Sequence, residues 1–318
     1  MKAAIYYQAG APDVLRYEDV PDPVCGENEV LIKVEAIAVE GGDFINRATV
    51  EPPATGRIVG YSAAGTIIAV GEKVENRQPG QRVATMAMEG SHAELRVAPA
   101  DWTWLIPESL DFATASVVPI AFGTAYQGLM SRRELKIGDT VLIQGGAGGV
   151  GVAAIQIAKH QGAKVIATLA GEERAGRLRE LGLDKAIDYE RQDVVAEVNA
   201  FTNGQGADMV LDLAGSTLGQ SSAALKEWGW LIMAGNAGGM TTTDLWPAQQ
   251  ANQTISGLFW GREVAKPEAR AVVDTLLEDV AAGKLKVVIE REFKLSEAAT
   301  AHRYAENHKV LGRIVLTP

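Results

Sequence analysis

Residues 144–151 read Gln-Gly-Gly-Ala-Gly-Gly-Val-Gly and lie between a short apolar run and a helical stretch. Within them, Gly146, Gly148 and Gly151 match the pattern G-x-G-x-x-G, which is informative only where a strand precedes it and a helix follows it. The first glycines permit a tight turn and let backbone N–H groups approach a pyrophosphate, and the last lets the helix pack closely on the strand. The stretch therefore predicts dinucleotide binding rather than a glycine-rich turn without a ligand.

The chain around this loop alternates short apolar runs with helical stretches. We expect helices and strands over these ranges: helices over 150–161 and 172–181, and strands over 141–143, 164–169, 186–189, 208–212 and 230–234. Continuous apolar strands that alternate with helices are typical of a parallel sheet covered on both faces. Because such crossovers are right-handed, this α/β part of the chain is predicted to form a doubly wound sheet.

Residues 1–118 have a different sequence pattern, with partly alternating runs of β-branched residues and frequent turn residues. This pattern predicts a small antiparallel barrel or sandwich. After Lys266 the chain returns to a helix over 267–282, to strands over 286–293 and 312–316, and to a further helix between these strands.

The composition limits the class of protein. The 318 residues include 30 Lys and Arg against 40 Asp and Glu, a net charge of −10, so the chain lacks the charge of a nucleic-acid binder or a polybasic membrane anchor. The single cysteine, Cys25, excludes an internal disulfide and a Cys-rich structural zinc site. No secretory signal pattern and no long apolar run is present, so we expect a cytoplasmic protein without a membrane span.

The end of the second predicted strand favours NADPH over NADH. An NAD-binding unit usually places Asp or Glu there to hold the ribose 2′-hydroxyl, but residues 167–171 read Ala-Thr-Leu-Ala-Gly. Arg174 follows directly and could pair with a 2′-phosphate, and Tyr189 could flank it. Glu172 and Glu173 lie beside Arg174 and weaken this interpretation, and a solvated arginine on a helix face is the alternative.

The same residues carry a resemblance to a known family. Residues 135–159, which run from Leu-Lys-Ile-Gly-Asp through the glycine loop to Ile-Ala-Lys, strongly resemble the medium-chain dehydrogenase/reductase superfamily. Within it, they are most similar to the zinc-free quinone oxidoreductase (zeta-crystallin-like) branch. The opening 1–3, the turn at 80–83 and the ending at 312–316 fit that branch too, so the resemblance covers the whole chain.

The resemblance implies an architecture and an activity. The architecture would be a GroES-like β-barrel catalytic domain of residues 1–118 and 262–318, with a Rossmann NADP-binding domain over 119–261. The activity would be NADPH-dependent hydride transfer to quinones or other conjugated carbonyls, in a homodimer paired through an edge strand. An alkenal or enoyl C=C reductase of the same superfamily is a second interpretation. An NADPH-binding redox sensor or crystallin-like protein with little turnover is a rival outside the enzymes.

The superfamily's zinc-binding segments are altered in this chain. Zinc alcohol dehydrogenases use a Cys-Gly-x-Asp segment, a Gly-His-Glu segment and a further cysteine, but here residues 40–43 read Glu-Gly-Gly-Asp and residues 60–62 read Gly-Tyr-Ser. Because a catalytic zinc needs three protein ligands, we predict no metal. The histidines show no ligand spacing and are interpreted as surface or packing residues: His92, His160, His302 and His308. Without a Lewis acid, conjugated acceptors are better substrates than alcohols, since they need only orientation, a dry pocket and a proton source.

Three residues in the altered segments are the catalytic candidates. Asp43 and Arg47 match the Asp-x-x-x-Arg of the quinone reductase pattern, but Glu40 stands where that pattern usually has Asn. A buried Glu40 with a raised pKa would be a proton donor, and a structural acid bonded to backbone N–H groups is an equal alternative. Tyr61 replaces the zinc-ligating histidine, so its phenol could bind a substrate carbonyl, relay a proton or merely fill space.

Cofactor contacts are expected at the carboxyl ends of the parallel strands and at the start of the following helix. The resemblance adds the segment around Thr124 and the segment 258–260. The full predicted set is Thr124, Gly146, Ala147, Gly148, Gly149, Val150, Gly151, Ala170, Gly171, Arg174, Tyr189, Ala214, Gly235, Asn236, Ala237, Phe259 and Trp260.

Overall fold

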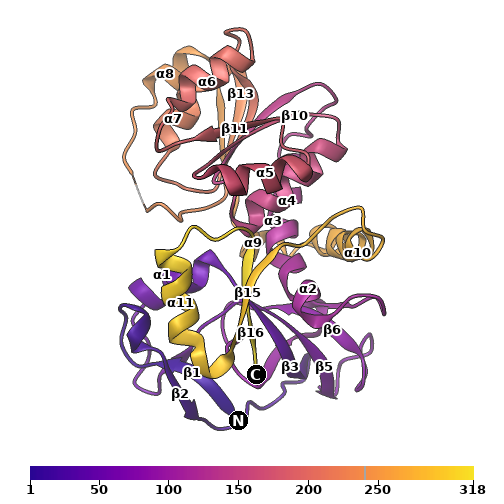
Figure 1. The fold of residues 1–318 in the computed structure, drawn as a ribbon. Coiled ribbons are helices and arrows are strands. Elements are labelled where there is room, and N and C mark those ends of the chain that lie inside the picture. The colour runs from indigo at the N-terminus through magenta and orange to yellow at the C-terminus, as the bar shows by residue number, and fades with distance from the viewer. Residues whose placement is uncertain (240) are drawn as a thin grey trace. The chain divides into compact units, whose positions relative to one another are not determined.

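The computed structural model of the chain describes residues 1–239 and 241–318. The chain divides into two compact units, which are described separately (Figure 1). Unit 1 comprises Met1–Ile120 and Val264–Pro318, and unit 2 comprises Ala121–Glu263. The prediction of an α/β chain with a parallel sheet is confirmed.

Unit 2 is built on a six-stranded sheet in which all neighbouring strands are parallel. The strands are β9 (Thr140–Gln144), β10 (Lys164–Leu169), β11 (Lys185–Asp188), β12 (Ala207–Asp212), β13 (Leu225–Met233) and β14 (Thr254–Gly257). Their spatial order is β11-β10-β9-β12-β13-β14. Numbered from β9, this is the order 3-2-1-4-5-6 of a doubly wound sheet. Such a sheet binds ligands where the strand order reverses, at the carboxyl ends of β9 and β12.

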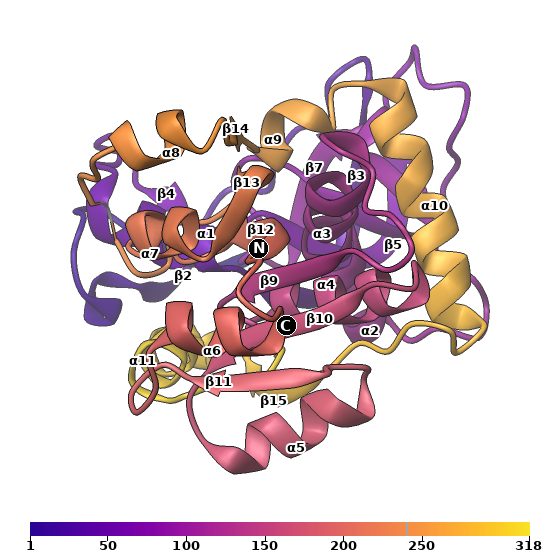
Figure 2. The ribbon, with the colours of Figure 1, turned by 90° about the horizontal axis from the view of Figure 1, so that it is seen from above.

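The helices of unit 2 cover both faces of this sheet, because its strands are apolar on both sides. They are α3 (Gly123–Tyr126), α4 (Gly149–His160), α5 (Glu172–Glu180), α6 (Val194–Phe201), α7 (Leu218–Ala223), α8 (Trp246–Gln250) and α9 (Trp260–Glu263), with a short π-helical segment at Gln127–Ser131. A second π-helical segment, Val118–Phe122, begins in unit 1 and ends in unit 2. Figure 2 shows α6, α7 and α8 on one side of the sheet and α4 on the other. Val194 and Val198 of α6 share a buried core with Leu142 of β9.

Unit 1 contains two sheets. The smaller has the order β2-β1-β4, and the larger has the order β15-β16-β3-β5-β6-β8, with β7 also paired to β3. Their strands are β1 (Lys2–Tyr6), β2 (Arg16–Asp19), β3 (Glu29–Val39), β4 (Arg57–Ile58), β5 (Ser62–Val70), β6 (Arg82–Met86), β7 (Leu95–Pro99), β8 (Thr103–Leu105), β15 (Ile289–Lys294) and β16 (Arg313–Thr317). All pairs are antiparallel except β15 with β16.

The two ends of the chain meet in the core of unit 1. β16 pairs with β3, so that Val315 lies opposite Ala38, and Leu316 shares a buried cluster with Ile37. The helices of this unit are α1 (Gly41–Thr49), α2 (Phe112–Val117), α10 (Pro267–Ala281) and α11 (Ala298–Asn307), with 3-10 turns at Pro12–Val14, Ala100–Trp102 and Leu295–Glu297. α1 and α2 lie within the first 118 residues, where only strands were named in advance, and α1 carries predicted site residues.

None of the helices in the described residues is long and apolar enough to cross a membrane.

Candidate functional site

The glycine loop joins the carboxyl end of β9 to the start of α4. Helix α4 begins at Gly149, and its N-cap Gly148 is extended, so the first N–H groups of the helix have no intrahelical acceptor. A Cβ on Gly151 would lie 2.4 Å from the Gly145 carbonyl oxygen, so only glycine lets the helix approach the loop this closely. A Cβ on Gly148 would meet nothing nearer than 3.7 Å, so space remains beside the helix terminus.

This geometry fits a pyrophosphate. Orphan N–H groups and the helix dipole together favour a bound anion. The Gly146 N–H is already used, since it donates to the Thr168 carbonyl at 2.9 Å. The Gly148 N–H is used as well, since it donates to the Gly145 carbonyl at 3.3 Å. The first N–H groups of α4, at Gly149 and Val150, are therefore the ones available for a phosphate.

An arginine with an unpaired side-chain nitrogen follows the carboxyl end of β10. Arg174, in the first turn of α5, has its Nη2 atom buried without a hydrogen-bond partner in the described residues. Glu172 does not neutralise it, because that carboxylate pairs with Arg179 at 2.5 Å. Ala170 and Gly171 precede this turn, and Tyr189 lies beside them, exposed by 54% with its N–H bonded to the Leu169 carbonyl at 3.2 Å. A guanidinium with an unpaired nitrogen beside an exposed ring fits an adenosine 2′-phosphate.

The loops after β12 and β13 pack against each other. The Gly238 N–H donates to the Ala214 carbonyl at 2.8 Å, and the Ala237 N–H faces the Leu213 carbonyl at 3.5 Å. Gly235 and Asn236 lie in the same contact, against residues 213–215. The structure therefore brings together four of the predicted cofactor residues: Ala214, Gly235, Asn236 and Ala237.

The segments around Thr124 and Trp260 also meet within unit 2. The buried Trp260 indole lies against Gly123, whose added Cβ would be 2.7 Å from the ring. Thr124 is buried in α3, whereas the Phe259 side chain is 56% exposed. The Trp260 indole nitrogen has no partner among the described residues.

In unit 1, Glu40 and Asp43 are buried at the start of α1. The Asp43 carboxylate accepts a hydrogen bond from the Glu40 N–H at 2.8 Å, which ties down the first turn of the helix. The Glu40 carboxylate forms an ion pair with Arg313 of β16. One oxygen of each carboxylate has no partner in the part of the chain that the structure describes.

Burial changes the proton affinity of both acids. Desolvation raises the pKa of Asp43 to about 8, helped by the nearby Glu40 charge and opposed by Arg313 and by the Glu40 N–H. Burial also raises the pKa of Glu40, but the Arg313 guanidinium opposes this shift directly. Of the two acids, Asp43 is therefore the one with no ion pair among the described residues and with a pKa of about 8.

Tyr61 lies over the first turn of α1. A Cβ on Gly42 would be 2.3 Å from its ring, so glycine makes this contact possible. Its phenol oxygen accepts a hydrogen bond from the Asn46 side-chain amide at 2.7 Å, which leaves the phenol hydrogen free to donate. Burial, followed by the Asp43 charge, raises the pKa of Tyr61 and keeps the phenol protonated.

Two residues that the sequence reasoning missed hold Tyr61. Asn46 lies one turn after Gly42 and Asp43, so predicting α1 would have placed all three on one face. Arg96 is 2% exposed and donates to the Tyr61 carbonyl at 2.7 Å. No signal in the sequence pointed to Arg96, because the alternation over residues 93–97 places the apolar side chains on the opposite face of the strand.

The four histidines are divided between the surface and the core of the protein. His160 and His308 are exposed as expected, but His92 and His302 are fully buried and their Nε2 atoms are 3.1 Å apart. Arg47 donates to His302 Nδ1 at 3.1 Å and also pairs with Glu306. Residues 92 and 302 share no sequence pattern, and only the fold brings them together. No group of three or more metal-binding side chains occurs among residues 1–239 and 241–318.

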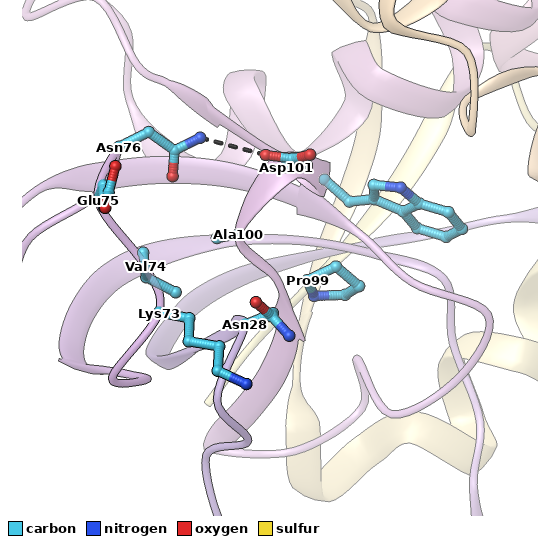
Figure 3. A pocket seen from close by; sticks show the side chains of 9 residues that line it. Asn28, Lys73, Val74, Glu75, Asn76, Pro99, Ala100 and Asp101 are labelled. Atoms are coloured by element: carbon cyan, nitrogen blue, oxygen red, sulfur yellow. Dashed lines mark hydrogen bonds between the residues drawn. The ribbon is translucent and has the colours of Figure 1, made fainter.

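Unit 1 also has a surface hollow of about 510 Å³, which is separate from these residues. Figure 3 shows Asn76 hydrogen-bonded to Asp101 across its rim, at 3.2 Å. Its lining consists of Asn28, Lys73, Val74, Glu75, Asn76, Pro99, Ala100, Asp101 and Trp102. None of the predicted site residues lies there.

Two family models match the chain. Residues 26–108 match an alcohol dehydrogenase GroES-like domain, and residues 149–278 match a zinc-binding dehydrogenase domain.

Individual proteins are similar over nearly the full length. A 2-haloacrylate reductase from a Burkholderia species is 32% identical, covering 99% of this chain and 98% of its own. A quinone oxidoreductase from Pseudomonas aeruginosa is 31% identical, covering 97% of each chain. The crystal structure of Escherichia coli quinone oxidoreductase complexed with NADPH is 26% identical, with a TM-score of 0.94 over 100% of both chains.

Proposed function

This chain belongs to the quinone oxidoreductase branch of the medium-chain dehydrogenase/reductase superfamily. We propose that it reduces conjugated carbonyl compounds, which bind beside Tyr61 and Asp43. It is an NADPH-dependent oxidoreductase with a GroES-like domain and a Rossmann-like domain. The observation that carries the function is the glycine loop at the open N-terminus of α4, in a chain that matches quinone oxidoreductases throughout. A sensor or crystallin-like role without turnover is not favoured, because the relatives are named for enzymatic reactions.

The domains and the assembly remain proposals. We propose a catalytic domain of residues 1–118 and 262–318 and a cofactor domain of residues 119–261, supported by the compact units of the fold. A homodimer paired through β14 is supported by its place at the edge of the sheet, and light scattering on the purified protein tests it. A cytoplasmic location fits the single cysteine.

NADPH, when bound, supplies the hydride for the reduction. We propose that the α4 terminus holds its pyrophosphate, that Arg174 and Tyr189 hold the adenosine phosphate, and that the remaining predicted loops hold the nicotinamide half. The loops orient the cofactor through backbone groups, because their glycines leave no side chain in the way.

The substrate side is proposed to work through hydrogen bonding and proton supply. The free phenol hydrogen of Tyr61 would donate to the substrate carbonyl oxygen, where negative charge develops as the acceptor carbon gains a hydride. Asp43, protonated near neutral pH, would supply the proton that completes the reduction. Glu40 is held by Arg313, which supports a structural role for this acid over proton donation.

We expect NADPH oxidation by the purified protein with 1,4-benzoquinone and with trans-2-hexenal, and none with simple aldehydes. The relative rates on the quinone and the alkenal decide between the quinone reductase and the C=C reductase interpretations. Stoichiometric tightly bound zinc in a metal analysis, or activity confined to alcohols, would contradict the proposal.

The same assay tests the role of Tyr61. The Tyr61→Phe variant should lose about ten- to hundredfold in kcat/KM, as expected for one lost donor to a developing oxyanion, with NADPH affinity unchanged. Tyr7→Phe, which removes a phenol on the exposed surface of the same unit, serves as the control and should retain full activity.

Replacing Arg174 with alanine should weaken NADPH binding by about tenfold or more and leave NADH binding unchanged, because only NADPH carries the 2′-phosphate. The matched control is Arg179→Ala on the same helix, where the guanidinium pairs with Glu172. Fluorescence titration with both cofactors gives the ratio. Equal losses for NADPH and NADH in the Arg174 variant would refute the proposed phosphate contact.

A further inference from the structure

A buried carboxylate lies beneath the loop that follows β12. Asp212 is 1% exposed and has no ion-pair partner in the described part of the chain. It accepts four hydrogen bonds: from the N–H groups of Ala214 and Gly215 at 3.0 and 2.9 Å, and from the hydroxyls of Thr217 and Ser221 at 2.9 and 2.7 Å. A desolvated charge is stable only with such a full set of donors, so this carboxylate fixes the loop at 214–215.

A second group of contacts leads from Asp212 to the glycine loop. The Gln144 side-chain amide donates to Ser221 Oγ at 3.3 Å, and its carbonyl oxygen accepts from Thr168 Oγ1 at 2.9 Å. Thr168 Oγ1 in turn accepts from the Gly145 N–H at 3.0 Å. The chain of contacts thus joins the carboxyl ends of β9, β10 and β12.

The donors in this chain point in one direction. A hydroxyl has one hydrogen, and Thr168 gives its hydrogen to Gln144, so its oxygen is left to accept from Gly145. The amide of Gln144 then faces Ser221, which gives its own hydrogen to Asp212. These four hydrogen bonds run toward the Asp212 charge, and aligned series of this kind strengthen each member. The Gln144 amide also donates to the Gln220 side-chain oxygen at 3.2 Å, which holds the amide in the same orientation.

We infer that Thr168, Gln144, Ser221 and Asp212 are positioning residues that hold the glycine loop and the loop at 214–215 as one NADPH-binding surface. The inference rests on the proposed binding of NADPH by these two loops. None of the four side chains needs to touch the cofactor. Removing one of these hydrogen bonds should misplace the loops at both ends of the series, because the remaining donors lose their alignment.

The test uses Thr168→Val, which keeps the shape of the side chain and removes both hydrogen bonds, and Thr168→Ser, which keeps the hydroxyl. We expect the valine variant to bind NADPH at least tenfold more weakly and the serine variant to bind within about threefold of wild type. Titration calorimetry gives the dissociation constants, and thermal melting reports the stability of each variant.

Thr202 provides a matched control in the same unit. Its hydroxyl accepts from the Gly206 N–H at 2.9 Å and donates to the Val198 carbonyl at 2.8 Å, which repeats the bonding of Thr168 away from the cofactor loops. Thr202→Val should lower the melting temperature without changing NADPH affinity. If it weakens NADPH binding as much as Thr168→Val does, the effect is general destabilisation and the inference fails.

The decisive measurement is the energetic coupling between Thr168 and Ser221, which lie at different points of this hydrogen-bonded series. Ser221→Ala should weaken NADPH binding as well, and it stands in for the valine variant if that protein does not fold. The double variant should be at most about threefold worse than the weaker single variant, because one break already opens the chain. Fully additive losses, or unchanged binding in the single variants, would overturn the inference. Wild type that binds NADPH but reduces no acceptor would refute only the proposed function.

Discussion

Gly151→Ala is expected to weaken NADPH binding by at least about a hundredfold, which corresponds to about 2.7 kcal/mol. The added Cβ would lie 2.4 Å from the Gly145 oxygen and 2.6 Å from two Gly146 backbone atoms. Backbone atoms cannot turn aside as a flexible side chain can, so either the loop or the start of α4 must move. A shift of about 1 Å in a positioned group can cost a factor of this size.

The matched control is Gly176→Ala in α5. An added Cβ there meets nothing within 4 Å, and alanine is favoured over glycine inside a helix by about 0.5–1 kcal/mol. This variant should therefore be as stable as wild type or slightly more stable, with unchanged NADPH affinity. NADPH binding by folded Gly151→Ala within threefold of wild type would show that the loop does not hold the cofactor in the way proposed.

The parts of the fold that depend on local pattern were predictable. The strands of unit 2 are continuous apolar runs, and a glycine loop between a strand and a helix has few other physical uses. Arg174 follows the end of β10, where the sequence has no acid, and its contact with a 2′-phosphate stays a prediction. Such features need only neighbours along the chain.

The parts that depend on distant residues were not predictable in this way. His92 and His302 meet only because β16 returns to pair with β3. Glu40 could be read as a proton donor or a structural acid until the structure placed Arg313 against it. The Asp212 chain joins side chains from three strands and a helix, each of which alone is an ordinary polar residue.

Removing the buried histidine pair is expected to remove a loss of stability that wild type shows as the pH falls below about 6.5, of up to about 1 kcal/mol per pH unit for each ring. Burial lowers the pKa of His92 to about 3 and, with the neighbouring His92 and Arg47, that of His302 well below its usual value. Below about pH 6.5 the two imidazole rings therefore bind protons in the unfolded chain but stay neutral in the folded chain. Each proton that only the unfolded state binds lowers the free energy of unfolding by about 1.36 kcal/mol per pH unit as the pH falls.

The buried acids act with the opposite sign. The pKa of Asp43 is raised to about 8 when folded, so its contribution is present at low pH and is lost as the pH rises toward 8. Burial raises the pKa of Glu40 in the same direction. These acids offset the histidines in the wild-type curve, so the histidine effect must be measured as a difference between wild type and variant.

The double variant His92→Gln/His302→Gln keeps polar side chains and removes both titrating rings. Urea unfolding at pH 7, 5.5 and 4.5 should show wild type losing stability relative to this variant as the pH falls, whatever offset separates them at pH 7. His160→Gln, at an exposed histidine of α4, should instead give a curve parallel to wild type. Parallel curves for the double variant would show that the pKa values of the buried rings are not lowered on folding, and the prediction would be wrong. The 3.1 Å contact between the rings and the nearby Arg47 cation both disfavour a second positive charge there.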